Sequence, residues 1–377
     1  MDLTPEDALR MNVLLAGALK AVRIDESKMT LHALSDKGEA KIQLNPNCRD
    51  ESYLRRVREA LSSHVLGSPG GYPVYLKRWT RMGQARDSIL ESLLLLGEPE
   101  AVVAVVNAPG ITDEIASRAW WASQTSENAR CMLRQEAVVQ GGMGPVLAQF
   151  LLEFLPFEEE ARDQIRSVRL VLQGELIDAA ERLRLWEKGK HRNAFQVGFL
   201  QAQPDDLPVE QVPGPAWEQA SRAARALLQT GNPFATQLCR LLGPAGQAFL
   251  AGVENVLKKP SNQDVMVELM HALAAHARAL PLPRKRLTSV EEIDAEVDQL
   301  IAGAEQGDDV LRDLAALLQG LSGSVHHIRA MLFLGLLDEP VLDPVFAGTD
   351  AIGSVMRKKL RPVTEPVLRE ITVLKGL

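Results

Sequence analysis

Glycine and proline divide an apolar stretch, residues 90–157, into short segments. Gly97 can adopt the left-handed conformation that ends a helix, and Pro99 suits the first turn of the next helix because no hydrogen-bonded N–H is needed there. A second break follows at residues 107–110, where an internal proline would clash with the preceding turn. Between the breaks, apolar residues recur at helical spacing. The stretch therefore predicts several short helices whose apolar sides pack on one another.

Two of these breaks share one pattern, a glycine stop followed by a proline start. Gly97 precedes Pro99, Gly144 precedes Pro145, and the two prolines lie 46 positions apart. This interval falls within the repeat length of HEAT and armadillo arrays, roughly 40 to 47 residues, but two copies do not establish a repeat. The sequence predicts a mainly α fold, either an irregular helical bundle or a HEAT-like stack of helix pairs.

The N-terminal region combines one helix with a change of period. Residues 5–20 are expected to form a helix capped by Thr4, with Leu9, Val13 and Leu14 as its apolar face. Residues 21–24, 29–34 and 40–44 then alternate between apolar and polar side chains, which predicts a small antiparallel meander. Its apolar face needs a cover, and either the first helix or a helix over residues 51–62 can supply it.

Proline-rich segments indicate the domain organisation. Residues 203–216 hold four prolines and are expected to be a linker, because such a segment is stiff and cannot continue a helix. We expect an N-terminal domain over residues 1–86, a helical domain over residues 87–202 and a C-terminal helical domain over residues 217–377.

Two later segments are expected to lie outside helices. Residues 280–286 contain two prolines and the basic triplet Arg284, Lys285 and Arg286. This triplet could meet an acidic partner, but a solvated connector is the favoured interpretation. The last helix is expected over residues 352–360, before a tail that contains two further prolines.

Composition limits the function classes. The 377 residues carry a net charge of −7, which argues against binding duplex DNA with the whole surface, although a local basic patch is compatible with it. No apolar run reaches the roughly 20 residues that cross a bilayer, and the N-terminus is acidic where a secretory signal would be basic. We therefore expect a cytoplasmic protein without membrane insertion.

Residues 52–86 contain seven cations and one acid, together with all three tyrosines of the chain. Guanidinium groups interleaved with aromatic rings suit phosphates, nucleotides or single-stranded RNA. A solvated basic face whose aromatic rings pack on adjoining helices is the favoured alternative. The glycine-rich residues 67–73 lack the motifs of a Walker A or dinucleotide loop. The candidate ligand or partner residues are Arg55, Arg56, Tyr75, Lys77, Arg78, Trp79 and Arg81.

The three cysteines lie far apart and are expected to be reduced thiols. Cys131 and Cys239 lie within helical patterns, which favours burial as small apolar side chains. Cys48 precedes a helix expected to start near Asp50, where the helix dipole and Arg49 would both favour the thiolate. A reactive thiol at Cys48, with persulfide handling as its function, is a minor hypothesis, because a cysteine beside a turn usually has no such role.

Motifs for metal binding or hydrolysis are missing from the sequence. His326 and His327 are adjacent and should point about 100 degrees apart on a helix, while His271 and His276 are five residues apart instead of the four of a helical zinc pair. Glu268 and His271 form a single E-x-x-H without the second copy that a di-iron bundle needs. We expect no metal ion, no cofactor and no catalytic residue.

Several strings of the chain resemble the DsrS proteins, which are encoded with the dissimilatory sulfur-oxidation machinery of sulfur bacteria. The resemblance covers roughly the first half clearly and the second half more diffusely, and it supplies no catalytic residues. It implies a cytoplasmic accessory protein of sulfur oxidation that contacts sulfur-carrier or sulfite-reductase proteins. The strings are LNPNCRD (residues 44–50), VLGSPGGYPVY (65–75), LLLGEPE (94–100), AWW (119–121) and MGPVL (143–147).

Two functional hypotheses from different classes follow. The favoured one is a non-catalytic accessory or interaction protein associated with sulfur oxidation and sulfur-relay proteins. The alternative is a regulator that binds RNA or a nucleotide through residues 52–86. Salt-dependent binding to RNA would support the alternative.

Overall fold

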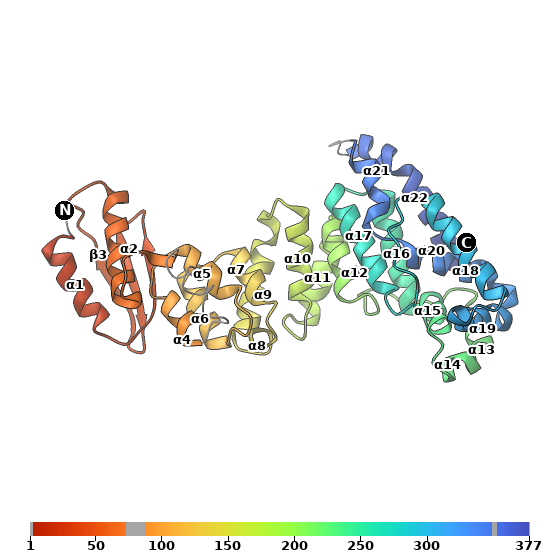
Figure 1. The fold of residues 1–377 in the computed structure, drawn as a ribbon, viewed down its shortest axis with the longest axis horizontal. Helices are drawn as coiled ribbons and strands as arrows, with labels where there is room; N and C mark the ends of the chain where they lie inside the picture. The colour runs from red at the N-terminus through yellow and green to blue at the C-terminus, as the bar shows by residue number, and fades with distance from the viewer. Residues whose placement is uncertain (1–2, 73–86, 349–352, 377) are drawn as a thin grey trace. The chain divides into compact units, whose positions relative to one another are not determined.

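The computed structural model describes residues 3–72, 87–348 and 353–376 (Figure 1). These residues are mainly α-helical, with a three-stranded antiparallel sheet near the N-terminus, which confirms the predicted fold class. The chain divides into two compact units, Met1–Phe154 and Leu155–Leu377. No helix within the described ranges combines the length and apolar composition needed to cross a membrane.

The first unit consists of the sheet and the helices before and after it in sequence. Its elements are α1 (Pro5–Leu15), β1 (Leu19–Asp25), β2 (Thr30–Ser35), β3 (Gly38–Gln43), α2 (Asp50–Leu66), α4 (Asp87–Leu93), α5 (Pro99–Val106), α6 (Asp113–Ala122), α7 (Ser126–Met132), α8 (Glu136–Val139) and α9 (Met143–Phe154).

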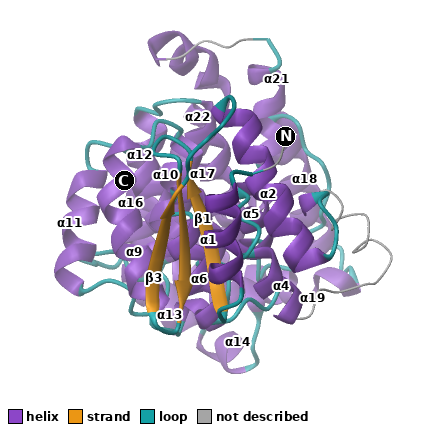
Figure 2. Ribbon diagram, turned by 90° about the vertical axis from the view of Figure 1, so that its left-hand side faces the viewer, coloured by secondary structure: helices purple, strands orange, loops and turns teal. Residues whose placement is uncertain are grey.

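The strands follow one another in the order β1-β2-β3, as the predicted meander requires. Ala33 at the centre of β2 lies opposite Val22 on one side and Ala40 on the other. The outer edge of β1 is covered, because the Val22 N–H donates to the carbonyl of Leu94 at 2.8 Å. Figure 2 shows β3 as the left-hand strand of the sheet.

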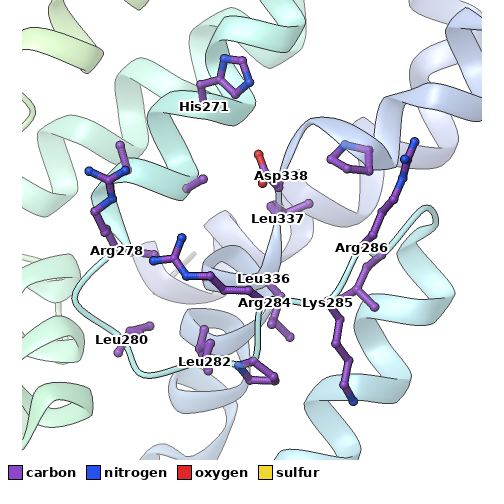
Figure 3. Close-up of a pocket in the computed structure, with 17 residues that line it drawn as sticks. His271, Arg278, Leu280, Leu282, Arg284, Lys285, Arg286, Leu336, Leu337 and Asp338 are labelled. Carbon is purple, nitrogen blue, oxygen red and sulfur yellow. The ribbon is translucent and has the colours of Figure 1, made fainter.

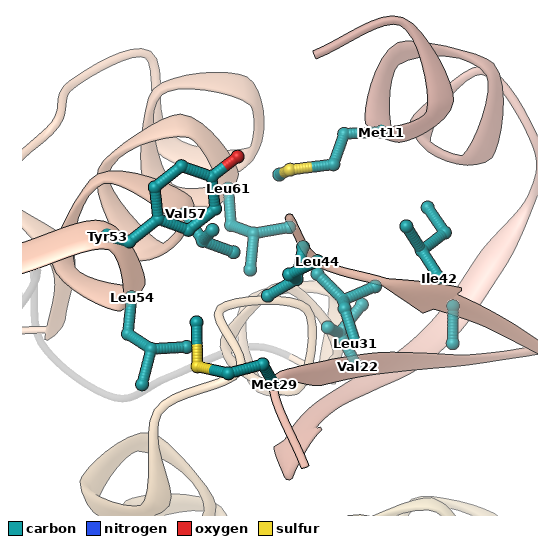
Figure 4. Close-up of a cluster of buried hydrophobic side chains, with 11 residues drawn as sticks. Met11, Val22, Met29, Leu31, Ile42, Leu44, Tyr53, Leu54, Val57 and Leu61 are labelled. Atoms are coloured by element: carbon teal, nitrogen blue, oxygen red, sulfur yellow. The ribbon is translucent and has the colours of Figure 1, made fainter. Parts of the chain in front are cut away.

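Both helices that the sequence offered as a cover for the sheet contribute to its core (Figure 4). Met11 from α1 and Tyr53 from α2 are buried in one cluster with Leu31 and Ile42 of the strands. Burial of each such side chain contributes about 1.5 to 3 kcal/mol. The apolar side of the sheet is therefore covered by two helices that flank it in sequence.

The apolar face predicted for α1 is wrong at Leu9 and Val13, whereas Leu14 packs against the core as predicted. Leu9 and Val13 are 66% and 69% exposed, whereas Asp7 and Met11 are buried. The helix also ends at Leu15, and β1 begins four residues later. The reason is polar: the Asp7 carboxylate accepts hydrogen bonds from elsewhere in the unit, which turns its side of the helix inward. Leu9 follows Asp7 by two positions and Val13 follows Met11 by two positions. Two positions are about half a helical turn, so both side chains lie on the opposite side of α1 and point outward.

The break at Gly97 and Pro99 behaves as predicted, whereas Gly144 does not end a helix, because α9 begins at Met143 and contains both Gly144 and Pro145. Gly97 has a φ of 64°, and an added Cβ there would lie 3.2 Å from the Ile24 side chain, so both conformation and space favour glycine. Pro99 is the first residue of α5, and Thr112 caps α6 by accepting from the N–H of Ile115. Local glycine, proline and capping residues thus determine where these helices begin and end.

The second unit is built from helices and short 3-10 turns. Its elements are η1 (Leu155–Phe157), α10 (Ala161–Val171), α11 (Ala179–Gly189), α12 (Asn193–Ala202), α13 (Trp217–Ala223), α14 (Arg225–Gln229), α15 (Pro233–Leu242), α16 (Pro244–Lys258), α17 (Gln263–His276), α18 (Val290–Glu305), η2 (Asp309–Leu311), α19 (Arg312–Gly320), η3 (Ser322–Ser324), α20 (Val325–Leu336), η4 (Glu339–Leu342), α21 (Asp343–Phe346) and α22 (Gly353–Lys375).

Helices of the second unit pack on partners that are distant in sequence. α12 contacts α16 and α17, and α22 contacts α16 and α20. In a repeat array each repeat would contact its sequence neighbours. The second unit therefore has the packing of an irregular helical bundle.

The proline-rich segment 203–216 lies inside the second unit and is fixed there. Leu207 is buried, and the Gly214 N–H donates to the carbonyl of Leu242 at 2.9 Å. Asp205 accepts two hydrogen bonds from Arg240, at 2.8 and 2.6 Å. The prolines make this segment stiff, but it is not a free linker between domains. The boundary between the two compact units lies between Phe154 and Leu155 instead.

The expected C-terminal tail is helical, so that prediction is wrong. α22 continues to Lys375 with Pro362 and Pro366 inside it. Its buried residues recur every three or four positions along the full length, which gives a continuous apolar stripe. Packing of this stripe outweighs the hydrogen bonds that the two prolines cannot donate. The stripe consists of Met356, Leu360, Val363, Thr364, Val367, Ile371 and Leu374.

Candidate functional site

The basic aromatic segment predicted from the sequence is described only in part. Tyr75, Lys77, Arg78, Trp79 and Arg81 lie outside the described residues. Their convergence on one cleft stays a prediction.

Arg55 and Arg56 are neighbours on α2 and differ in environment. The Arg55 side chain is exposed, and its Nε lies 3.8 Å from a carboxylate oxygen of Glu59. Arg56 is half-buried, and its Nη1 has no hydrogen-bond partner among the residues that the structure describes. Successive helical residues point about 100 degrees apart, so α2 itself does not direct both groups at one ligand.

A groove of about 570 Å³ runs beside this part of α2. Arg58 on its wall pairs with Glu26, and the Tyr72 N–H donates to Glu98 at 3.0 Å. The described lining thus holds more carboxylates than cations, which does not favour a phosphate. Its charged side chains are Arg55 and Arg58 against Glu26, Glu59, Glu98 and Glu100.

Cys48 lies two residues before the first residue of α2, as expected, and its side chain packs half-buried against the core of the first unit. Cys131 and Cys239 have raised pKa values because burial disfavours their thiolates. Across the described ranges, no group of three or more His, Cys, Asp or Glu side chains has the arrangement of a metal site.

A basic pocket lies in the second unit (Figure 3). Its volume is about 520 Å³, and we call it the basic pocket. One side is formed by the end of α17 and the segment that follows it, and the other by the end of α20 and the start of η4. The lining residues are His271, Ala274, Ala275, Ala277, Arg278, Leu280, Leu282, Pro283, Arg284, Lys285, Arg286, Leu287, Gly335, Leu336, Leu337, Asp338 and Pro340.

The apolar wall of the basic pocket depends on a close approach to α20. Leu280 is buried, and its side chain and that of Leu282 lie against Gly335. A Cβ added at Gly335 would lie 2.8 Å from Leu282 Cδ1 and 3.1 Å from Leu280 Cδ1, so the two leucine side chains would have to shift to admit a larger residue. Glycine at this position therefore lets the Leu280 and Leu282 side chains pack closely against α20.

Two of the four cations that line the basic pocket are neutralised by carboxylates outside it. Lys285 Nζ lies 2.7 Å from an oxygen of Glu296, and Arg286 lies 2.6 Å from an oxygen of Asp343. Arg278 and Arg284 are exposed and have no ion-pair partner within the described parts of the chain. Figure 3 shows these two side chains next to each other on one side of the pocket.

The other ionisable groups near the basic pocket are engaged. His271 Nε2 lies 3.2 Å from an oxygen of Glu339, and its Nδ1 lies 3.6 Å from an oxygen of Glu268. Asp338 Oδ1 accepts the Glu339 N–H at 2.8 Å, which caps η4. Asp338 has no ion-pair partner in the described chain and keeps its negative charge, so the balance of Arg278 and Arg284 against it is still positive.

This arrangement suits a carboxylate on an apolar carrier. Guanidinium groups bind carboxylates and phosphates through paired hydrogen bonds. The neighbouring leucine and proline side chains can cover aliphatic surface of a ligand. The lining contains no Phe, Tyr or Trp, so a nucleobase finds no aromatic ring on which to stack.

Sequence reasoning identified the basic triplet of this pocket but favoured a solvated connector for it. The signal that could have indicated otherwise is the Leu-Pro-Leu-Pro string, which carries apolar side chains that a free connector would expose. The sequence does not single out Arg278, because this residue follows the end of a helix, where cations are common. Arg278 lines a pocket only because the end of α20 lies opposite the end of α17 in the folded chain.

His276, considered in the sequence only for its spacing from His271, is buried in a polar network instead. Its ring stacks on Phe249 with centroids 4.1 Å apart, and Nδ1 lies 3.1 Å from the Gln237 amide nitrogen. Arg240 donates to the His276 carbonyl at 2.9 Å while it binds Asp205. Burial, together with the positive charge of Arg240, lowers the pKa of His276 to about 4. This network fixes the proline-rich segment to α15 and α17.

Comparisons of the chain with protein-family models, with curated proteins and with solved structures gave no match. The function proposed below therefore rests on the chemistry of the described residues and on the resemblance noted in the sequence.

Proposed function

We propose that this chain is a non-catalytic cytoplasmic interaction protein, and that its basic pocket binds an acidic segment of a protein partner. One observation carries the proposal: Arg278 and Arg284 are exposed beside an apolar wall, and no carboxylate of the described chain pairs with them. Charge of this sign is notable in a chain of net charge −7, whose own acids could have neutralised it. Carboxylates on a partner would complete the pairing.

A peptide fits the basic pocket better than RNA does. The cations lie beside Leu280, Leu282 and Leu336, so a ligand that combines acidic and aliphatic groups would contact both kinds of surface. RNA would gain phosphate contacts only. An acidic peptide also accounts for the modest number of uncompensated cations, because electrostatic steering of a protein partner needs a local patch and not a basic surface.

The resemblance to the DsrS proteins implies the class of partner. Under this proposal the chain is an accessory protein of sulfur oxidation that contacts sulfur-carrier or sulfite-reductase proteins. Binding of purified proteins of this class, lost when the two arginines are changed, would link the pocket to that role. If no such protein binds but a synthetic acidic peptide does, the pocket function stands and its assignment to sulfur oxidation fails.

The direct test is a titration of the full chain with a fluorescent ten-residue peptide of Glu, Asp and Leu. We expect the R278E/R284E variant to bind at least about tenfold more weakly, because two exposed attractions of about 0.2 to 1 kcal/mol each are replaced by repulsions. The matched control is R184E/R225E, which reverses two exposed arginines of the same unit that do not line the pocket. Circular dichroism checks that both variants keep their helices.

Three results would count against the proposal. Equal loss of affinity in R278E/R284E and in the control would mean that net charge alone drives binding. An unlabelled RNA oligonucleotide that displaces the peptide completely at low concentration would favour the RNA-binding alternative. No measurable binding of the acidic peptide at low salt would remove the pocket as a peptide site.

A further inference from the structure

The first unit carries an exposed apolar pair that its own fold does not use. Leu9 and Val13 are one turn apart on α1, and both are more than half exposed. Single exposed apolar residues are ordinary on protein surfaces. This pair, however, lines a groove of about 690 Å³ between α1 and β3, together with Leu14, Leu19, Ala40 and Ile42. The groove thus places a group of apolar side chains beside the last strand of the sheet, next to the polar residues that complete its lining.

The outer edge of β3 presents backbone groups to this groove. Ser35 and Gly38 close the β2–β3 hairpin, so Gly38, Ala40 and Ile42 exchange hydrogen bonds with β2. By the same alternation the N–H and C=O groups of Glu39, Lys41 and Gln43 point away from β2. Within the described chain, no hydrogen bond reaches these outward groups. They form a template for one more strand.

The same alternation holds for β1, where it can be checked. Val22 lies opposite Ala33 in a pair that does not exchange hydrogen bonds, so its N–H should point away from β2. It donates outward to Leu94, at 2.8 Å. The outer edge of β1 is therefore bonded to the unit itself at Val22, whereas the β3 edge has no such bond among the described residues.

Charge at the open edge limits which strand can bind. Lys37 and Lys41 have no ion-pair partner among the described residues, whereas Asp36 pairs with Lys20. Glu39 is also engaged, since it accepts from Arg23, His32 and Trp121. Lysine on an edge strand discourages indiscriminate strand addition. The uncompensated charge selects a strand that carries acidic side chains.

We infer that β3 and the groove beside α1 bind an extended segment of a partner protein as a fourth strand. Its alternate side chains are apolar on the side of Leu9 and Val13 and acidic on the side of Lys41. Main-chain hydrogen bonds to residues 39, 41 and 43 hold it, and the apolar pair and the lysines select its sequence. This site lies in the first unit and does not depend on the basic pocket of the second.

The test uses an eight-residue fluorescent peptide that alternates Val and Glu, and the full chain. Hydrogen exchange of the free chain should be slow at Ala40 and Ile42 and fast at Glu39, Lys41 and Gln43, and the peptide should slow the last three. A peptide that alternates Val and Lys should bind at least tenfold more weakly. Two N-methylated versions of the Val-Glu peptide, blocked at the Val or at the Glu nitrogens, should differ, because alternate N–H groups face opposite sides of a strand.

Variants separate the two contributions to binding. L9E/V13E should weaken the Val-Glu peptide at least tenfold, whereas V103E/V146E, a matched change at two exposed valines of the same unit, should leave binding unchanged. K37E/K41E should reverse the preference toward the Val-Lys peptide. R278E/R284E should have no effect on this peptide, which separates the present inference from the function proposed for the basic pocket.

Several outcomes would overturn the inference. Unchanged exchange at residues 39, 41 and 43 in the presence of bound peptide would place the peptide elsewhere. Equal binding of both N-methylated versions would exclude strand addition. Dimerisation of the chain that L9E/V13E abolishes, without binding of the peptide, would show that a second copy occupies the edge.

Discussion

Lys285 Nζ lies 2.8 Å from one carboxylate oxygen of Glu296 and 2.7 Å from the other. The Glu296 side chain is 8% exposed, so α18 presents a nearly buried carboxylate to a segment of the basic pocket. This pair directs Lys285 away from the pocket and fixes the backbone that carries Arg284. The pocket is thus shaped by an ion pair in which neither guanidinium of the proposed site takes part.

The first prediction concerns this pair. E296Q should lower the free energy of unfolding of the second unit by about 1 to 2 kcal/mol, because it weakens a hydrogen-bonded pair in which Lys285 remains half-exposed. It should also weaken acidic-peptide binding by loosening residues 280–286. Chemical denaturation and the peptide titration measure the two effects. D309N, which breaks the exposed pair between Arg312 and Asp309, is the control and should change stability by less than about 0.5 kcal/mol.

The second prediction concerns the buried carboxylate that orients α1. Asp7 accepts from the Tyr53 hydroxyl at 2.5 Å and from the Asn45 N–H at 2.7 Å. D7N should destabilise the sheet region by about 1 to 3 kcal/mol at pH 7, because a neutral amide replaces an acceptor of several hydrogen bonds. Hydrogen exchange of the strand amides reports this unit separately from the second.

The pKa of Asp7 determines how the effect of D7N on the free energy of unfolding changes with pH. Burial alone would raise the pKa of Asp7, but hydrogen bonds from Tyr53, Asn45 and Thr4 together lower it below its ordinary value of 3.8. The contribution of Asp7 is then complete above about pH 4 and is lost as the pH falls further. The stability difference between the wild type and D7N should therefore shrink from pH 7 to pH 3. A difference that grows in acid would contradict a lowered pKa.

The third prediction concerns His276. Its pKa of about 4 lies below the ordinary value of 6.5, so the folded chain holds the ring neutral while the unfolded chain binds a proton. Stability from this group is complete above pH 6.5 and falls as the pH drops toward 4, by about 3 kcal/mol in total. H276N, whose amide oxygen can replace Nδ1, should flatten that part of the pH profile. Chemical denaturation at pH 7 and at pH 4.5 measures the free energy of unfolding of both proteins. An equal change with pH in the wild type and in H276N would contradict a buried neutral ring.

The fourth prediction concerns the prolines of α22. Pro362 is exposed, and its nitrogen cannot donate to the carbonyl of Lys358. P362A restores that hydrogen bond without removing a buried side chain and should raise the free energy of unfolding by about 1 to 2 kcal/mol, after allowance for the stiffer unfolded chain of the wild type. Thermal and chemical denaturation measure the change. A lower stability in P362A would mean that the proline ring contributes packing.

Local signals in the sequence were sufficient for much of the fold. Helix stops and starts at Gly97 and Pro99, the cap at Thr112 and the period-two strands near the N-terminus depend on interactions within a few residues. They could be predicted because backbone conformation and capping are decided locally. The mainly α class with an N-terminal meander follows from the same signals.

Features decided by long-range packing could not be predicted in this way. The rotation of α1 depends on Tyr53 and Asn45, which lie about forty residues away, and the helical state of residues 361–375 depends on α16 and α20. The proline-rich segment 203–216 was expected to be a linker, but a salt bridge to Arg240 and a backbone bond to Leu242 hold it. Proline content specifies stiffness and does not specify exposure.

The candidate site shows the same limit. The basic triplet was visible in the sequence, but its role depended on what opposes it, and the opposing side, which includes Gly335, comes from about fifty residues further along the chain. Composition also drew attention to residues 52–86, where the described cations Arg55 and Arg58 lie beside glutamates. Charge counts along a sequence omit the partners that folding brings to each cation.

The fifth prediction is a charge exchange at the basic pocket. The titration pairs two proteins, the wild type and R278E/R284E, with two ten-residue peptides that differ only in having Glu and Asp or Lys and Arg beside the same leucines. The wild type should prefer the acidic peptide and the variant the basic peptide, each by at least about tenfold, because the same apolar wall serves both and only the sign of two charges changes. Two results would contradict this prediction. In the first, the folded variant loses affinity for the acidic peptide but gains none for the basic peptide; in the second, both proteins prefer the same peptide. Either result would mean that the two arginines do not select the partner and that the proposed binding role of the pocket is wrong.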